Sequence, residues 1–415
     1  MQMYQSPEIT VLLMTCKLYI NAEKKDKLGR FLEEHSIDWE LLYQLADRHR
    51  LKPFLYQALQ KSSIGSTGFL ARLQNDCREA ATDHLLKRHH YHSVAKLLAE
   101  NGIDHLALKG VYLAENFYPE SSLRSTGDID LLINKEDVFR TIELLQQHGY
   151  QLNRKHTIYC QQKDKALLTD LFEVSLFKPF FGDSFFDIDL HWQMLGFNKH
   201  YVVFDLPYMR SQPEFHIEKQ IVLLVTHHGV TNIWQRIYYI NDLYFLLARY
   251  DINWDWLMAE LRRYGFEGVF LAGLYWCQEI WSFRLPDSIK PLVDQLITRR
   301  VAEEYAENWT NKKSYEFSDA IVRQLKFLAK TQTNLSGKAK VYRTFLTSRV
   351  FQPSLFNVGG SYIYIPKELG FMTVFIRAVQ SLLRFLPAKS DRVSKGKNAT
   401  TNQNVESSES SQSVK

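Results

Sequence analysis

The sequence contains little cysteine, with four residues at positions 16, 77, 160 and 277 of 415. None of them forms a C-x-x-C pair, which excludes a zinc ribbon or a disulfide framework and fits a reducing compartment. The charge is nearly balanced, and the net charge of +5 is too small to predict a dedicated nucleic-acid-binding protein. With 45% hydrophobic and 23% charged residues, the composition also excludes a collagen-like, coiled-coil or generally disordered chain.

The sequence also lacks an apolar run of the roughly 20 residues that spanning a bilayer requires. The best candidate, 369–386, is interrupted by Arg377, Gln380 and Arg384. No basic run precedes the short apolar stretch 11–14 and no cleavage site follows it, so we expect no signal peptide and a cytoplasmic location. The segment 369–386 is amphipathic, and packing on its own domain and contact with a membrane surface both stay open for it.

A length of 415 residues suggests two or three folding units. Apolar residues recur at helical spacing in 1–100 and again in 216–387, which predicts two helical regions. Between them, 101–215 changes to short β-prone runs separated by turns. The last segment, 388–415, has almost no apolar residues and is predicted to be a disordered tail.

The middle region predicts a small mixed β-sheet. The expected strands cover residues 105–108, 128–133, 168–177 and 185–192. Helical spacing is expected between the first strands, over 111–118 and 136–148. The predicted fold class is therefore α+β, a small mixed sheet flanked by N- and C-terminal helical regions.

Two aspartates stand at the beginning of the second expected strand. Asp128 and Asp130 are two residues apart, so both carboxylates point to one face of the strand. Like charges so placed repel unless a cation lies between them, and Mg²⁺ bound by carboxylates and substrate phosphates is the usual partner. Because an isolated D-x-D is common, two ordinary solvated aspartates are the alternative.

The pattern occurs a second time in the last expected strand, where Asp187, Asp189 and His191 share one face. If the two strands are neighbours, either Asp187 or Asp189 can join the first pair. Three carboxylates would then form a two-metal site for phosphoryl or nucleotidyl transfer. The alternative is a solvent-exposed Asp187 and a strand-end His191 bonded to the backbone.

Lys109 and Gly110 occupy the turn between the first expected strand and the following helix. There a glycine lets the backbone approach a phosphate, and a helix N-terminus offers free N–H groups, so this turn is a candidate triphosphate seat. A glycine chosen only for turn geometry is the alternative. Arg124, four residues before Asp128, is placed to bind a phosphate or to pair with a surface acid.

Several polar residues fall within the second helical region: His227, His228, Trp234, Arg236 and Asp242. Polar side chains in such a stretch either form a buried network between helices or line a pocket. The sequence leaves both interpretations open.

Four stretches together resemble a bacterial family of uncharacterised nucleotidyltransferases within the DNA polymerase β-like superfamily. They are LALKG at 106–110, LAENFYP at 113–119, RSTGDIDLL at 124–132 and DLHW at 189–192. The resemblance extends over about 10–387, through the flanking helical regions, and is most specific in the first three stretches and the last strand.

The resemblance implies three catalytic, metal-ligating carboxylates: Asp128, Asp130 and Asp189. The implied ion is Mg²⁺ or Mn²⁺. It further implies nucleotide contacts from Lys109, Gly110, Arg124 and Gly127. For the polar residues farther along, it favours an acceptor pocket formed by His191, His228, Trp234, Arg236 and Asp242.

The implied activity is transfer of a nucleoside monophosphate from a nucleoside triphosphate such as ATP. The receiving group would be a hydroxyl or phosphate on an unidentified small molecule, saccharide, protein or tRNA, with Asp189 or a nearby group as base. The first strand ends in Lys-Gly-Val where the superfamily usually has Gly-Ser or Gly-Gly, and the spacing from Gly110 to Asp128 is long. These departures keep an alternative open: a catalytically degenerate adaptor, at the membrane surface in cell-envelope or natural-product assembly.

Overall fold

The computed structural model describes most of the chain in two compact units, one of Met1–Lys313 with Gln324–Phe345 and the other of Ser314–Arg323 with Leu346–Lys415. The described residues are 6–20, 25–62, 64–153, 156–157, 168, 171–181, 184–196, 202–310, 317–350, 354–358, 361–366, 369–372 and 375–376. The expected disordered tail, 388–415, lies outside them, as does the expected helix beyond residue 376.

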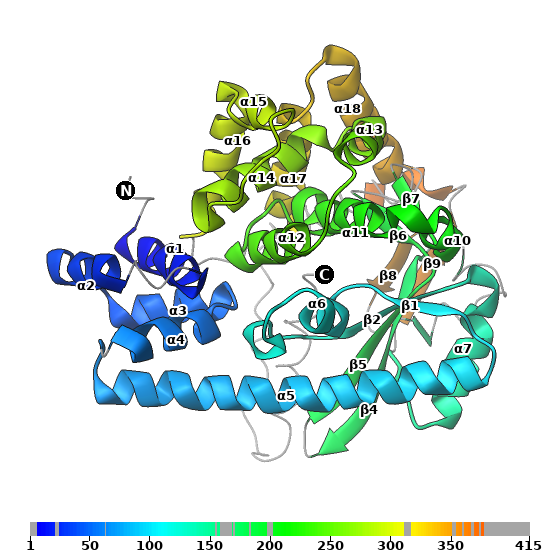
Figure 1. Ribbon diagram of the computed structural model, residues 1–415. Helices are drawn as coiled ribbons and strands as arrows, with labels where there is room; N and C mark the ends of the chain where they lie inside the picture. The colour runs from blue at the N-terminus through cyan, green and yellow to red at the C-terminus, as the bar shows by residue number, and fades with distance from the viewer. Residues whose placement is uncertain are drawn as a thin grey trace, which may run out of the picture. The chain divides into compact units, whose positions relative to one another are not determined.

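The N-terminal region is helical, as predicted. Its helices are α1 (Pro7–Ile20), α2 (Lys25–Glu34), α3 (Trp39–Arg48), α4 (Lys52–Ser62) and α5 (Thr67–Glu100). The side chain of Ser66 caps α5 by accepting a hydrogen bond from the Phe69 N–H, and the helix ends before Gly102, which has a φ of +65°. Figure 1 shows α5 as a long helix along the bottom of the view, below α6 and far from α11 and α12.

The central sheet has five strands in the order β1-β2-β5-β4-β3. They are β1 (His105–Ala107), β2 (Ile129–Ile133), β3 (Gln151–Leu152), β4 (Glu173–Phe181) and β5 (Ser184–His191). β2 and β5 are parallel and the other neighbours are antiparallel, so the sheet is mixed and the predicted α+β class is confirmed. Between the strands lie α6 (Gly110–Asn116), η2 (Ser121–Leu123), η3 (Lys135–Asp137) and α7 (Val138–Gln147).

One expected strand boundary was wrong. Leu168, placed in a strand by its β-prone neighbours, is helical, and β4 begins only at Glu173. A short apolar run such as this one does not distinguish a strand from a helical turn by its periodicity. The correction matters because Glu173 belongs to the candidate site.

The two faces of the sheet differ in chemistry. Ile129 and Leu131 on β2 and Ile188 on β5 are buried on one face. The other face carries Asp130 and, two residues along the same strand, Leu132, which belongs to the apolar cluster formed largely by the C-terminal helices. The face with the carboxylates is therefore turned toward those helices.

The C-terminal region is mainly helical, with a short hairpin at its start. Its elements are β6 (Met194–Gly196), β7 (Val202–Phe204), α10 (Leu206–Arg210), η4 (Pro213–Phe215), α11 (His216–Leu224), a π-helical turn η5 (Val225–Thr231), α12 (Ile237–Arg249), α13 (Trp254–Tyr264), α14 (Glu267–Trp281), α15 (Lys290–Val293), α16 (Leu296–Ala306), α17 (Phe317–Lys330) and α18 (Leu335–Val350). Among the described residues, no helix combines the length and the apolar character needed to cross a bilayer.

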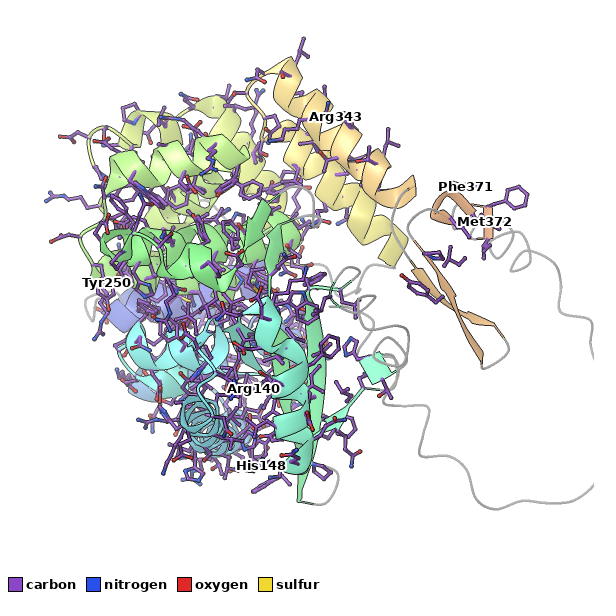
Figure 2. The ribbon with its side chains drawn as sticks, turned by 90° about the vertical axis from the view of Figure 1, so that its right-hand side faces the viewer. Arg140, His148, Tyr250, Arg343, Phe371 and Met372 are labelled. Carbon is purple, nitrogen blue, oxygen red and sulfur yellow. The ribbon has the colours of Figure 1, made fainter. Side chains whose placement is uncertain are left out.

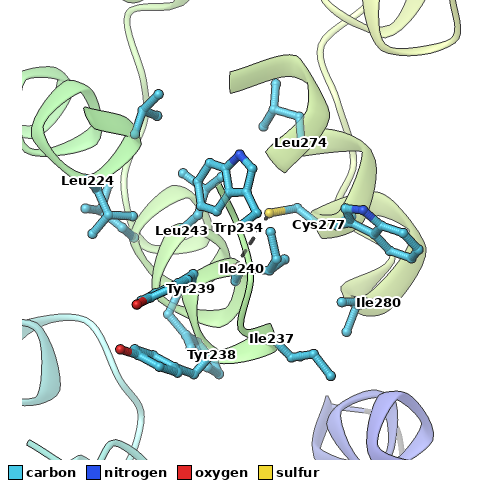
Figure 3. Close-up of a cluster of buried hydrophobic side chains, with 14 of the residues drawn as sticks. Leu224, Trp234, Ile237, Tyr238, Tyr239, Ile240, Leu243, Leu274, Cys277 and Ile280 are labelled. Atoms are coloured by element: carbon cyan, nitrogen blue, oxygen red, sulfur yellow. Dashed lines mark hydrogen bonds between the residues drawn. The ribbon is translucent and has the colours of Figure 1, made fainter. Parts of the chain in front are cut away.

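The core of this region forms around Trp234, whose side chain has no exposed surface. Its indole Nε1 donates a hydrogen bond to the Val269 carbonyl at 3.0 Å, so the one polar atom of the ring is satisfied. In Figure 3 the ring lies among aliphatic side chains of α12 and α14, close to Cys277. A Cβ on Gly273 of α14 would lie 2.8 Å from this ring, so the close packing requires a glycine there.

The second unit contains an antiparallel hairpin of β8 (Ser354–Val358) and β9 (Ser361–Ile365). The helical periodicity of the second half of the sequence did not predict this hairpin. After it, Phe371 and Met372 lie in a short helical turn with 57% and 43% of their surface exposed (Figure 2).

Candidate functional site

The sheet places Asp130 directly opposite Asp189. The strands that carry them, β2 and β5, are parallel neighbours, and these two residues are paired in the register. Both side chains project from the face that is turned toward the C-terminal helices. Asp130 has 5% of its surface exposed, so its carboxylate is removed from bulk solvent.

Two cations contact the Asp130 carboxylate at the same oxygen. The Lys109 ammonium, at the turn between β1 and α6, lies 2.8 Å from Asp130 Oδ1, and His191 Nε2 lies 3.1 Å from it. Burial alone would raise the pKa of Asp130, but Lys109 and His191 outweigh burial and hold that pKa far below its usual range. The carboxylate is therefore ionised and held in place on two sides.

Glu173 on β4 completes the environment of His191. The two residues are paired in the register, and Glu173 Oε2 lies 3.1 Å from His191 Nδ1. Burial lowers the pKa of His191, but the bonds to Asp130 and Glu173 prevail and raise it to about 9. No sequence pattern pointed to Glu173, because only the pairing of β4 with β5 brings it to the site.

The pKa of Asp189 is shifted in the opposite direction to that of Asp130. Burial and the neighbouring charge of Asp130 raise the pKa of Asp189 to about 6, although a hydrogen bond from Ser175 favours its ionised form. Two carboxyl groups in one site thus have pKa values that are pushed in opposite directions. A group with a raised pKa gains ionisation when a cation is placed beside it.

Among the described residues, Asp130, Asp189 and His191 form a cluster whose side-chain ligand atoms all lie within 4.8 Å of one another, which is close enough for a metal ion to bridge. Carboxylate oxygens are the ligands of Mg²⁺ and Mn²⁺, so Asp130 and Asp189 fit either ion. The protonated His191 has no lone pair to offer a metal and instead holds the Asp130 carboxylate. Asp187 is half-buried, and burial raises its pKa, but it is not in this cluster. The geometry therefore brings Asp189, rather than Asp187, to Asp130.

The loop before β2 lies tightly against the turn at Gly110. Gly110 has a φ of +44°, and a Cβ there would lie 2.9 Å from the Asp128 carbonyl oxygen. Asp128 itself is half-buried directly before β2, and Gly127 is exposed near the Arg50 guanidinium. The glycine at position 110 is thus required by both backbone conformation and space.

Arg124 and Asp242 form a second, fully buried polar group. Arg124 Nε donates to Asp242 Oδ1 at 2.8 Å and Nη2 donates to Oδ2 at 3.0 Å, while Nη1 donates to the Gly110 carbonyl at 2.8 Å. Asp242 also accepts hydrogen bonds from Tyr118 Oη at 2.6 Å and His228 Nε2 at 2.9 Å. Burial opposes ionisation, but Arg124 prevails and holds the pKa of Asp242 far below its usual range.

The residues expected to form the site therefore fall into separate groups. The first group contains Lys109, Asp130, Asp189 and His191. The second contains Arg124, His228 and Asp242. The two groups are linked through Gly110, which follows Lys109 and whose carbonyl accepts a hydrogen bond from Arg124. Trp234 lies in the helical core. Arg236 is half-buried at the start of α12, where its charge acts on His49 and Tyr239.

Comparison with known proteins identifies a family that the chain matches. A family model described as "Uncharacterised nucleotidyltransferase" matches residues 35–282, which include the whole central sheet, both polar groups and the helices from α3 to α14. No curated protein and no solved structure matches the chain.

Proposed function

Because the chain belongs to the uncharacterised nucleotidyltransferase family, we propose that it transfers a nucleoside monophosphate from a nucleoside triphosphate to an acceptor, with release of pyrophosphate. The site of transfer would be the carboxylate-bearing face of the sheet. The observation that carries the proposal is the pairing of Asp130 with Asp189 on adjacent parallel strands, with the Lys109 ammonium on the same carboxylate.

Asp130 and Asp189 would hold a Mg²⁺ or Mn²⁺ ion together with Asp128 from the loop before β2. When bound, such an ion neutralises phosphate charge and supports in-line displacement at phosphorus. The raised pKa of Asp189, about 6, supports this role, because a site built for a cation leaves like-charged carboxylates close together in its absence.

Lys109 would bind a phosphate oxygen of the triphosphate. Its ammonium already lies beside Asp130, and a point charge on a flexible stem can bridge a carboxylate and a phosphate. Arg124 acts as a positioning residue: its guanidinium is committed to Asp242 and to the Gly110 carbonyl, so it fixes the Lys109–Gly110 turn.

The first test is incorporation of α-labelled phosphate from each of the four nucleoside triphosphates, with Mg²⁺ or Mn²⁺, into components of a cell extract. We expect a labelled product with the wild-type chain and none with Asp130→Asn. Asp187→Asn is the matched control, since this carboxylate lies on β5 two residues from Asp189 but outside the ligand cluster, and it should retain incorporation. Equal incorporation by wild type and Asp130→Asn would contradict the site.

The second test measures nucleotide binding without requiring turnover. In isothermal titration calorimetry, the double substitution Asp128→Asn with Asp130→Asn should abolish the Mg²⁺-dependent part of nucleotide binding. Far-UV circular dichroism checks that the fold is retained. Unchanged affinity in the folded double variant would refute the assignment of these carboxylates, whatever the acceptor.

A further inference from the structure

Two consecutive histidines in the π-helical turn η5 bond to each other. His227 Nδ1 and His228 Nδ1 lie 2.9 Å apart. On a regular α-helix, adjacent side chains diverge by about 100° and do not meet. Here the turn is widened, with the Asn232 N–H donating to the His227 carbonyl five residues earlier. π-Helical turns of this kind occur frequently at functional sites.

The widened turn is held in place by close packing against α14. A Cβ on Gly229 would lie 2.5 Å from Val269 Cγ1 and 2.9 Å from the Trp234 ring. Only glycine allows this approach, since real Cβ atoms do not come that close to other heavy atoms. The orientation of the two imidazoles is therefore set by the core and not by the solvent.

The hydrogen-bond chain determines where the protons are. Asp242 is ionised and accepts from His228 Nε2, so His228 Nε2 carries a proton. Burial, reinforced by Arg124 and opposed by Asp242, lowers the pKa of His228 to about 4, so His228 is neutral and its Nδ1 bears a lone pair. His227 Nδ1 must then be the donor in the bond between the two rings.

It follows that a neutral His227 carries its lone pair on Nε2. Burial lowers the pKa of His227 well below its usual value, and the charges of Lys109, Asp130 and His191 also act on it. His227 is half-buried, whereas His228 is 1% exposed. A neutral imidazole with a defined tautomer, carried by η5, thus lies within range of the charges of Lys109, Asp130 and His191.

We propose that His227 is the general base of the transfer reaction and that the acceptor group is therefore a hydroxyl. His227 Nε2 takes the hydroxyl proton while the acceptor oxygen attacks the α-phosphorus of the nucleoside triphosphate. The O–H bond breaks and an O–P bond forms, and the bond from the α-phosphorus to its bridging oxygen breaks with its electron pair leaving on pyrophosphate. His227 then releases the proton to solvent. The inference rests on the proposed nucleotidyl transfer.

Two features suit His227 to this role. The charge of a bound triphosphate raises the pKa of a histidine beside it, so His227 gains basicity when the donor nucleotide is present. The resulting imidazolium keeps its Nδ1–H bond to His228, which is in turn bonded to the ionised Asp242. A third group thus orients the base and fixes its tautomer, as the acid does in a Ser-His-Asp triad. A phosphate dianion as acceptor would carry no proton to remove and would not need the base.

The proton positions are tested by NMR of the wild-type chain labelled with ¹⁵N-histidine, with assignment by through-bond correlation to the backbone. We expect His227 to carry its proton on Nδ1 and His228 on Nε2. A proton on His227 Nε2 would overturn the proposal, because Nε2 would then have no lone pair with which to take the hydroxyl proton. This measurement needs no substrate and no substituted chain.

The catalytic role is tested by pyrophosphate release from the preferred nucleoside triphosphate in the same cell extract. His227→Gln should lower the rate by about 100-fold or more, the usual effect of removing a general base, with nucleotide affinity unchanged. His227→Ala should regain part of the rate with added imidazole. His92→Gln, at an exposed position of α5, is the control and should keep the wild-type rate.

The outcomes separate the two proposals. If nucleotide binding depends on Asp130 but His227→Gln keeps the full rate, the base assignment fails and the nucleotidyl transfer stands. If Asp130→Asn leaves nucleotide binding unchanged, the proposed function itself fails, whatever the tautomer of His227.

Discussion

The buried pair of Arg124 and Asp242 allows one effect to be worked out from the structure. We predict that Asp242→Asn, which changes the shape of the side chain very little, strongly destabilises the protein. Asp242 Oδ1 and Oδ2 each accept one N–H of the guanidinium, at 2.8 and 3.0 Å. Whichever way the asparagine amide is turned, its NH₂ group replaces one of these oxygens and meets an N–H of Arg124. Two N–H donors, one from the asparagine and one from Arg124, then face each other without an acceptor.

The magnitude follows from burial and charge. A hydrogen bond to a charged group contributes about 1.5–3 kcal/mol. The substitution also leaves the Arg124 guanidinium, 5% exposed, without its counter-ion, and breaking a buried pair in this way costs about 3–5 kcal/mol. Since the lost hydrogen bond is part of that figure, we expect a total loss of about 3–5 kcal/mol.

The assay is urea denaturation followed by tryptophan fluorescence, because Trp234 and Trp281 lie in the core next to α12. Asp104→Asn is the matched control: Asp104 pairs with Arg210 at the same 2.8 Å, but the two side chains are 54% and 52% exposed. An exposed pair contributes about 0–1 kcal/mol. If Asp242→Asn shifts the urea midpoint no more than Asp104→Asn does, the reasoning from burial is refuted.

Three further predictions concern the same region. Asp189→Asn should raise the free energy of unfolding at pH 8 in EDTA by about 2–3 kcal/mol and should leave it almost unchanged at pH 4. The pKa of Asp189 is raised to about 6, so ionisation of this carboxyl above pH 6 destabilises the folded wild-type protein, and asparagine removes that cost. Urea titrations at both pH values measure the difference. Gly110→Ala should cost about 1–3 kcal/mol and weaken nucleotide binding measured by calorimetry, because its Cβ would lie 2.9 Å from the Asp128 carbonyl. Gly229→Ala should lower the melting temperature, by a loss of about 1–3 kcal/mol, since its Cβ would lie 2.5 Å from Val269, and an unchanged melting temperature would show that the π-helical turn can shift.

Much of the fold could be predicted because its signals are local. Helical spacing identified the N-terminal helices, and short β-prone runs between turns identified β1, β2 and β5 close to their observed bounds. The π-helical turn and the β8–β9 hairpin were not predicted. The first continues the helical pattern of α11, and its glycine, Gly229, does not by itself mark a widened turn. The second consists of short apolar runs, and periodicity does not decide whether such runs are strands.

The candidate site could be predicted only in part, because only some of its residues carry a local sequence signal. Asp130 and Asp189 each stood out through a D-x-D on an expected strand. Arg124 was expected at the nucleotide, but the structure commits its guanidinium to Asp242, 118 residues away in the chain. His227 was noted among other polar residues, and only the bond to His228 singles it out.

The sequence by itself determined the helical period of the N-terminal region, the strands β1, β2 and β5, the face of its strand on which each aspartate stands, and the resemblance to the family to which the chain belongs. The tertiary structure alone decided that Asp189 rather than Asp187 stands opposite Asp130, and that Glu173 reaches His191. The physical reason is that these contacts join segments far apart in the chain, so they depend on strand order and register. A shift of one residue in the register of β5 would turn every side chain of the strand to the other face of the sheet, and no local pattern records that choice.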